Sequence, residues 1–121
     1  MPRVLVTGAT GFLGSHIAET LVQHGFTVRC TVRPSSSLKW LQNLDIEKIA
    51  VDFNDAANLQ KACDGVDVVV HNAGITRAKN DAEFFEVNTN TTERLAKAAI
   101  AAKVSRFIFI SSLEARGPDG F

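Results

Sequence analysis

Three glycines near the amino terminus have the spacing of a phosphate-binding turn. Gly8, Gly11 and Gly14 form a G-x-x-G-x-x-G run between a strand-like apolar stretch and a stretch with helical periodicity. In such a turn the first glycine permits a tight bend, the second lets a pyrophosphate approach the backbone, and the third lets the helix pack closely. The helix amino terminus would then bind the phosphates. Glycines that only mark a chain reversal are the alternative, which the flanking pattern disfavours.

The next strand-like run lacks the acidic residue that many dinucleotide sites use. Those sites place Asp or Glu about 20 residues beyond the glycines, where it accepts a hydrogen bond from a ribose 2′-hydroxyl. Here the run ends in Thr31, Val32 and Arg33. The planar guanidinium of Arg33 suits a 2′-phosphate, and Arg29 is a second, less well-placed cation. This favours NADP, with NAD as the other candidate, unless Arg33 is only a solvated surface residue.

Three further segments follow strand-like runs. Asp52 and Phe53 could hydrogen-bond an adenine amino group and cover its ring, or Asp52 could serve only the loop before the next helix. Ala73 and Gly74 place small side chains where a backbone passes close to a ligand, or where the chain simply turns. Ser112 would face the reactive end of a cofactor lying across the strands, although serine pairs after strands are commonly structural.

Short apolar runs alternate with longer helical stretches along the chain. We expect strands at Arg3–Thr7, Phe26–Val32, Ile46–Val51, Val66–Val70 and Arg106–Ser111, and helices at Phe12–His24, Ser35–Leu44, Asp55–Ala62 and Asp81–Lys103. Parallel strands need such crossovers, and a nearly continuous aliphatic run suits a strand covered on both faces. The pattern predicts an α/β fold, a doubly wound parallel sheet of the Rossmann type with five strands and about four helices.

Composition narrows the possible partners. The 121 residues suffice for a single domain, and 13 basic side chains balance 13 acidic ones, so no net charge attracts nucleic acid or an anionic membrane. No apolar run approaches the roughly 18 residues of a membrane span, and the first residues do not resemble a leader, so we expect a cytoplasmic protein. Cys30 and Cys63 are expected to be reduced packing residues. His16, His24 and His71 are too dispersed for a metal site, and His71 is expected to pack in the interior.

These segments together resemble a known family. Val4–Gly14, Asp52-Phe53, His71–Gly74, Val87-Asn88 and Phe107–Gly117 are similar to the extended short-chain dehydrogenase/reductase family, in its NAD-dependent epimerase/dehydratase group. The run Thr27–Pro34 is more similar to the NADP-dependent branch of the dihydroflavonol reductase kind. The resemblance covers essentially the whole chain, which corresponds to the amino-terminal part of the family's longer chains.

The resemblance implies a role for each candidate site residue. It implies a pyrophosphate site made by Gly8, Thr10, Gly11, Phe12, Leu13 and Gly14, adenine contacts by Asp52 and Phe53, a ribose-side wall of Ala73 and Gly74, and a substrate hydrogen bond from Ser112. The family's acid/base is a tyrosine with a lysine four residues later, on the helix after the fifth strand. This sequence contains no tyrosine, ends at Phe121 before that helix, and has Arg116 where many relatives carry another tyrosine.

We therefore expect residues 1–121 to be a single, truncated dinucleotide-binding domain without its substrate-binding part. The complete protein would transfer hydride at a sugar-nucleotide or ketone carbon, and this chain alone would be inactive. A non-catalytic dinucleotide-binding sensor or regulatory module is the alternative. The run Phe107–Ile110 would be a hydrophobic sheet edge. It predicts a homodimer, or higher self-association, through this edge or the adjacent helix face, unless Leu113–Phe121 folds back over the edge.

Overall fold

The computed structural model describes residues 2–9, 11–32, 41–72 and 81–110, with side chains throughout except at residues 81–88. Strands and helices alternate within these ranges. The elements are β1 (Arg3–Thr7), α1 (Phe12–Gln23), β2 (Thr27–Val32), β3 (Glu47–Ala50), α2 (Ala56–Cys63), β4 (Val68–His71), α3 (Asp81–Ala101) and β5 (Arg106–Phe109). All five expected strands are therefore present.

The strands form one parallel sheet in the order β3-β2-β1-β4-β5. The chain winds outward from the central β1 through β2 to β3, and then returns to place β4 on the other side of β1. The winding direction thus reverses between β1 and β4. In open parallel sheets, ligands bind at the carboxyl ends of the strands beside such a reversal. The doubly wound α/β fold expected from the sequence is confirmed.

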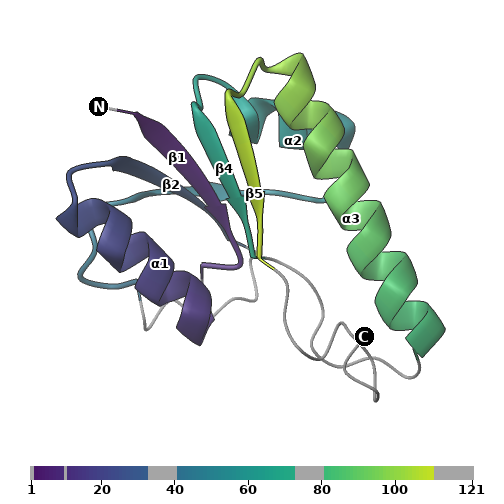
Figure 1. Ribbon diagram of the computed structural model, residues 1–121, viewed down its shortest axis with the longest axis horizontal. Helices are drawn as coiled ribbons and strands as arrows, with labels where there is room; N and C mark the ends of the chain where they lie inside the picture. The colour runs from purple at the N-terminus through teal and green to yellow at the C-terminus, as the bar shows by residue number, and fades with distance from the viewer. Residues whose placement is uncertain (1, 10, 33–40, 73–80, 111–121) are drawn as a thin grey trace.

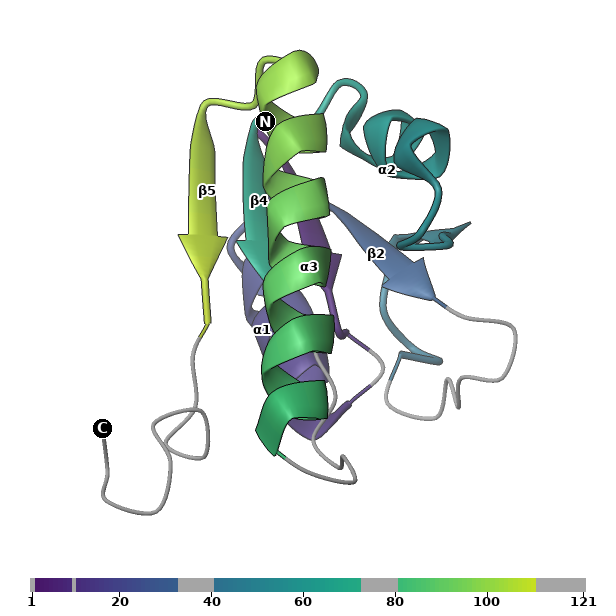
Figure 2. The same cartoon turned by 90° about the vertical axis from the view of Figure 1, so that its right-hand side faces the viewer.

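Helices cover both faces of this sheet, with α1 on one face and α2 and α3 on the other (Figures 1 and 2). The central strand β1 contributes to both cores, because successive side chains of a strand point to opposite faces. Leu5 packs with Leu59 of α2 and Leu95 of α3, whereas Val4 and Val6 pack in the core beneath α1. Burial on both faces explains why β1 reads as a continuous apolar run.

Local signals in the sequence place the helix ends well. Gly25, immediately after α1, has φ +87°, and its amide donates to the Val22 carbonyl at 3.0 Å. The Asp55 carboxylate accepts hydrogen bonds from the Ala57 and Asn58 amides at 3.0 and 3.3 Å, which caps α2. Both are ordinary helix-terminating and helix-starting arrangements, so these boundaries follow from nearby residues alone.

The helix expected over Ser35–Leu44 is wrong in the part that the structure describes. Residues 41–44 form a turn and a bend, with the Leu44 amide donating to the Leu41 carbonyl at 3.2 Å; residues 35–40 lie outside the described ranges. Leu41 is fully buried in the core beneath α1, and β3 begins at Glu47, so the intervening chain has room for one turn only. The described ranges contain three helices where four were expected.

Candidate nucleotide-binding site

The turn between β1 and α1 lies at the carboxyl end of the central strand. Gly8 adopts φ +70°, a left-handed conformation that glycine reaches at little cost. A Cβ atom on Gly14 would lie 1.9 Å from the Gly8 carbonyl oxygen and 2.8 Å from the Cα atom of Ala9. Glycine is therefore required at both positions by the fold itself.

Gly11 differs from the other two glycines. Its backbone is extended, with φ −85° and ψ 176°, and a Cβ atom placed there would lie 3.8 Å from the Gly8 carbonyl oxygen, an ordinary contact distance. The described chain therefore leaves room for a side chain at this position. A bound group that needs the backbone surface would explain the glycine, as the pyrophosphate interpretation requires.

The amino terminus of α1 has no side-chain cap among the described residues. Gly11 is the residue before the helix, it provides no side-chain cap, and the first turn carries no acidic residue. Phe12 and Leu13 are 64% and 54% exposed, and the Phe12 ring meets the His16 ring edge-on at 4.5 Å. The positive end of the helix dipole is thus available to an anion at the β1–α1 turn.

Asp52 and Phe53 follow β3. Asp52 is exposed, and its Oδ1 accepts a hydrogen bond from the Asn54 amide at 2.8 Å; Asn54 Oδ1 in turn accepts one from Arg94 of α3 at 2.8 Å. Phe53 is half-buried against the core beneath α2 and α3. These contacts hold the turn in place. Asp52 has an exposed side chain and follows the carboxyl end of β3, on the same side of the sheet as the carboxyl end of β1, where the glycines begin.

The remaining candidate residues lie outside the described ranges. These are Thr10, Arg33, Ala73, Gly74 and Ser112. Thr10, Arg33 and Gly74 follow the carboxyl ends of β1, β2 and β4 by one to three residues, and the described strand ends belong to one edge of the sheet. Their assignments therefore rest on the sequence.

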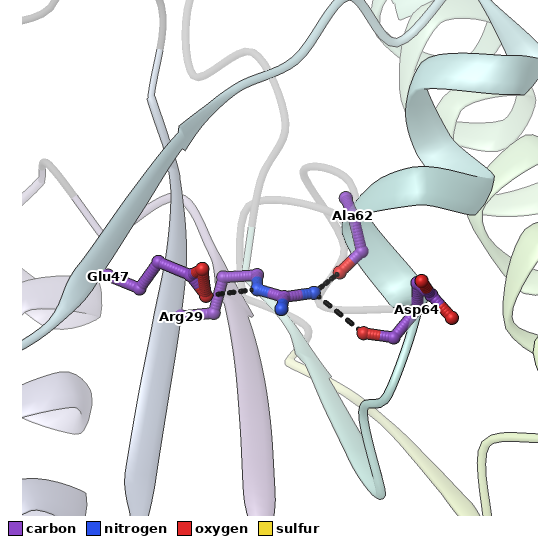
Figure 3. Close-up of polar contacts among 4 residues, drawn as sticks. All are labelled: Arg29, Glu47, Ala62 and Asp64. Atoms are coloured by element: carbon purple, nitrogen blue, oxygen red, sulfur yellow. Dashed lines mark hydrogen bonds and ion pairs between the residues drawn. The ribbon is translucent and has the colours of Figure 1, made fainter.

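The prediction that Arg29 could be a second phosphate-binding cation is wrong, because other contacts engage its guanidinium. Its side chain is 10% exposed, and Nε donates to a Glu47 carboxylate oxygen at 2.6 Å (Figure 3). Nη1 donates to the carbonyl oxygens of Ala62 and Asp64 at 2.7 and 2.9 Å. The guanidinium thus joins β2, the first residue of β3 and the carboxyl end of α2. These contacts hold the Arg29 guanidinium away from the carboxyl end of β2, which lies at Val32.

A buried histidine joins β1 and β4 to α3. His71 is 1% exposed; its Nδ1 lies 2.7 Å from Thr7 Oγ1, and its Nε2 lies 3.1 Å from Thr92 Oγ1. Thr7 Oγ1 also accepts a hydrogen bond from the Asn72 amide at 2.9 Å. Burial lowers the pKa of His71 to about 4, so the ring is neutral at pH 7. The expected interior packing is confirmed, but the threonine partners could not be inferred from the sequence pattern.

The cysteines behave as packing residues. Cys30 lies in the core beneath α1 and Cys63 in the core on the opposite face, so the sheet separates the two free thiols. Burial raises the pKa of the Cys30 thiol to about 12 and that of Cys63 to about 11, with nearby Lys48 and Arg29 opposing the respective shifts. Neither thiol is a reactive thiolate at neutral pH.

The described residues contain neither a metal-binding cluster nor a membrane-spanning helix. No group of three or more histidine, cysteine, aspartate or glutamate side chains there is arranged to hold a metal ion. Within the same ranges, no helix combines the length and the apolar character needed to cross a bilayer.

Curated proteins are similar in sequence to this chain. Ceramide reductase from Caulobacter vibrioides is 37% identical over 115 residues, which cover 95% of this chain and 36% of the reductase. A 3 beta-hydroxysteroid dehydrogenase/Delta 5-->4-isomerase from Mycobacterium tuberculosis is 36% identical over 118 residues, covering 91% of this chain and 31% of that enzyme. The chain thus spans about a third of the length of these curated relatives.

A solved structure and a family model agree with these relatives. A short-chain dehydrogenase/reductase superfamily protein from Agrobacterium tumefaciens, solved with bound NAD, superposes with a TM-score of 0.75 at 34% identity, covering 95% of this chain and 34% of that one. The sequence model of the NAD dependent epimerase/dehydratase family matches residues 4–121. The resemblance read from the sequence is confirmed, and the chain belongs to the NAD dependent epimerase/dehydratase family.

Proposed function

We propose that this chain is the dinucleotide-binding part of an NADP-dependent oxidoreductase or epimerase. The observation that carries the proposal is the β1–α1 turn, where the fold requires glycine at positions 8 and 14 and leaves open space beside Gly11, the residue before α1. The turn lies beside the reversal between β1 and β4, and at the amino terminus of α1, where Gly11 supplies no side-chain cap. All three features support a bound pyrophosphate at this edge.

Each part of a dinucleotide has candidate binding residues in this chain. Backbone amides at the start of α1 would bind the pyrophosphate, Asp52 and Phe53 would hold the adenine, and Arg33 would bind a 2′-phosphate. Ala73 and Gly74 would leave space for the ribose, and Ser112 would donate a hydrogen bond to the reacting oxygen of the substrate. When bound, the nicotinamide ring supplies or accepts the hydride.

The relatives favour a ketone and its alcohol as the substrate pair of the complete protein. The two curated relatives are named as a ceramide reductase and a 3 beta-hydroxysteroid dehydrogenase/Delta 5-->4-isomerase, names that describe a reduction and the dehydrogenation of a hydroxyl-bearing molecule. We propose the same reaction class here, with a sugar-nucleotide as the second substrate class.

A substitution at Gly11 tests the proposal. Valine prefers the extended backbone that Gly11 adopts, and a Cβ atom there makes only an ordinary 3.8 Å contact, so Gly11→Val should fold, with the modest cost of an apolar residue before a helix. Its side chain would occupy the surface on which the pyrophosphate lies. We expect calorimetric titration to give a dissociation constant for NADPH at least about tenfold higher than wild type, with Gly11→Ala between the two. Equal affinities in all three proteins would disprove this site.

Arg33 should determine the cofactor preference. A charge-assisted hydrogen bond to the 2′-phosphate contributes about 1.5–3 kcal/mol, so wild type should bind NADPH roughly tenfold or more tightly than NADH. Arg33→Ala should remove the preference by weakening NADPH binding alone. Lys48→Ala, which removes an exposed cation from β3, is the matched control and should leave the preference intact. A preference that survives in Arg33→Ala would show that another group recognises the phosphate.

This chain alone is expected to bind the cofactor without turning over substrate. Its 121 residues include no tyrosine, and general acid–base catalysis needs a group of suitable pKa within hydrogen-bond distance of the reacting oxygen. We expect no NADPH oxidation above background with a panel of ketones and nucleotide sugars. Measurable turnover by the purified chain, abolished by Gly11→Val, would contradict this expectation.

We also propose that the chain forms homodimers through β5. This strand lies at an edge of the described sheet, where Ile108 and Phe109 are 40% and 50% exposed, and an apolar edge is a template for strand pairing. Light scattering over a concentration series should show a dimer that Ile108→Lys converts to a monomer. Ile100→Lys, at a 77% exposed position of α3, is the control. A wild-type monomer at high concentration would refute the dimer.

A further inference from the structure

One buried polar cluster is not explained by nucleotide contacts or by core packing. This His71 cluster consists of His71, Thr7, Thr92 and the Asn72 amide, and it joins β1 and β4 to α3. Thr7 and His71 are direct partners in the β1–β4 register and are 0% and 1% exposed. The cluster lies at the carboxyl ends of the two strands between which the winding reverses.

The cluster is built for a single geometry. A neutral imidazole has one N–H donor and one acceptor nitrogen, so one threonine hydroxyl donates to the ring of His71 and the other accepts from it. Among the described residues, no buried side-chain nitrogen or oxygen lacks a hydrogen-bond partner. Because hydrogen bonds are directional, a fully satisfied buried cluster fixes its members more tightly than apolar packing does.

The cluster connects directly to the glycine turn. Thr7 is bonded to Gly8, whose carbonyl oxygen accepts from the Gly11 amide at 3.4 Å. The same oxygen is the atom that a Cβ on Gly14 would meet at 1.9 Å. A shift of Thr7 therefore moves the Gly8 carbonyl, and with it the start of α1. The hydrogen bonds to Thr7 thus act on the placement of the whole turn.

The opposite side of the cluster is held by α3 and β5. The Phe107 and Phe109 rings of β5 lie 6.2 and 5.5 Å from the His71 ring, between centroids. Thr92 is on α3, one turn before Leu95, which is fully buried in the core shared with α2. His71 is thereby linked to the core shared by α2 and α3, a cluster that includes none of the described residues of the glycine turn.

We propose that His71 is a positioning residue for dinucleotide binding, which holds Thr7, and through it the Gly8–Gly14 turn, in register with α3. This inference rests on the proposed function, because it assigns the cluster to the same nucleotide site. It predicts that a substitution in α3 affects binding at the distant β1–α1 turn. Removing the Thr92 hydroxyl from α3 should weaken binding at a turn to which Thr92 belongs neither in sequence nor in structure.

The experiment is a hydroxyl deletion in α3 combined with a second substitution at His71. Thr92→Val should raise the dissociation constant for NADPH about fivefold, the effect of losing one neutral hydrogen bond. Thr92→Ser, which retains the hydroxyl, should restore wild-type affinity. Thr91→Val, at the neighbouring position of the same helix, controls for the cost of a β-branched apolar residue in a helix. Thr92→Ala replaces Thr92→Val if the valine variant does not fold.

A double-mutant cycle separates positioning from general destabilisation. In a His71→Leu background, Thr92→Val should have no further effect on NADPH affinity, because the route through His71, which the described contacts provide, is already removed. Circular dichroism should confirm that each titrated protein is folded. Additive effects, or Thr92→Val binding like wild type while Gly11→Val binds weakly, would overturn this inference and leave the proposed function standing. Failure of wild type to bind NADPH or NADH would overturn both.

Discussion

Gly14→Ala should lower the free energy of unfolding by at least about 3 kcal/mol, although alanine normally stabilises a helix relative to glycine. The new Cβ would lie 1.9 Å from the Gly8 carbonyl oxygen, 2.6 Å from its carbon and 2.8 Å from the Cα atom of Ala9. All three are backbone atoms, which cannot rotate away as a side chain can. The start of α1 would have to move away from β1, with loss of the packing beneath that helix. Urea denaturation followed by circular dichroism measures the change.

Gly11→Ala is the matched control for Gly14→Ala. It adds the same methyl group three residues earlier, where the nearest atom is 3.8 Å away. We expect the free energy of unfolding to fall by no more than about 1 kcal/mol, because the only cost is that alanine is less favourable than glycine at the position before a helix. Equal stabilities of the two variants, or a Gly14→Ala protein as stable as wild type, would show that α1 does not pack on the turn as described.

Arg29→Met should be the second most destabilising of these changes, by about 2 kcal/mol. Methionine keeps much of the side-chain volume but leaves the buried Ala62 carbonyl without its donor, and such an orphaned group costs about 1–3 kcal/mol. The lost Glu47 ion pair adds less, because the Glu47 side chain is 54% exposed and can turn to water. The loss should be measurable by urea denaturation.

Glu47→Gln provides the control for the ion pair. It removes the charge but keeps an oxygen that can accept from Arg29, so we expect a cost below about 1 kcal/mol. If Glu47→Gln were as destabilising as Arg29→Met, the ion pair would outweigh the two carbonyl contacts. If neither variant lost stability, Arg29 would not hold α2 against the sheet.

The features that the sequence predicted well are encoded by residues close together in the chain. The glycine spacing, the Gly25 helix end and the Asp55 cap each depend on a few neighbouring residues. The alternation of apolar runs with helical stretches predicts the order of strands and helices along the chain. The expected helix over Ser35–Leu44 is wrong over residues 41–44, because its polar start and apolar end fit a helix locally, whereas burial of Leu41 and the short path to β3 impose a turn.

The features that the sequence did not predict depend on strand register. Thr7 and His71 are 64 residues apart, and Arg29 contacts a carbonyl 33 residues away. Such pairs follow only once β1 is known to lie between β2 and β4, and once α2 is placed over the sheet. The sequence alone therefore indicates a second, less well-placed phosphate-binding cation at Arg29 and an interior packing residue at His71. Polar residues inside otherwise aliphatic strands were the signal that marked both positions.

Direct mapping of the bound nucleotide tests the central claim, that the Gly8–Gly14 turn binds a dinucleotide. In a 15N–1H NMR titration of the chain with NADPH, the amide signals of Gly8, Gly11, Leu13 and Gly14 should shift most. The amide of Gly65 is the internal control and should not shift, because Gly65 lies just before β4, at the amino-terminal ends of the strands. Saturable shifts at the turn with an unchanged Gly65 signal are the predicted result. An unchanged turn at saturating NADPH, or shifts centred on Gly65, would contradict the account.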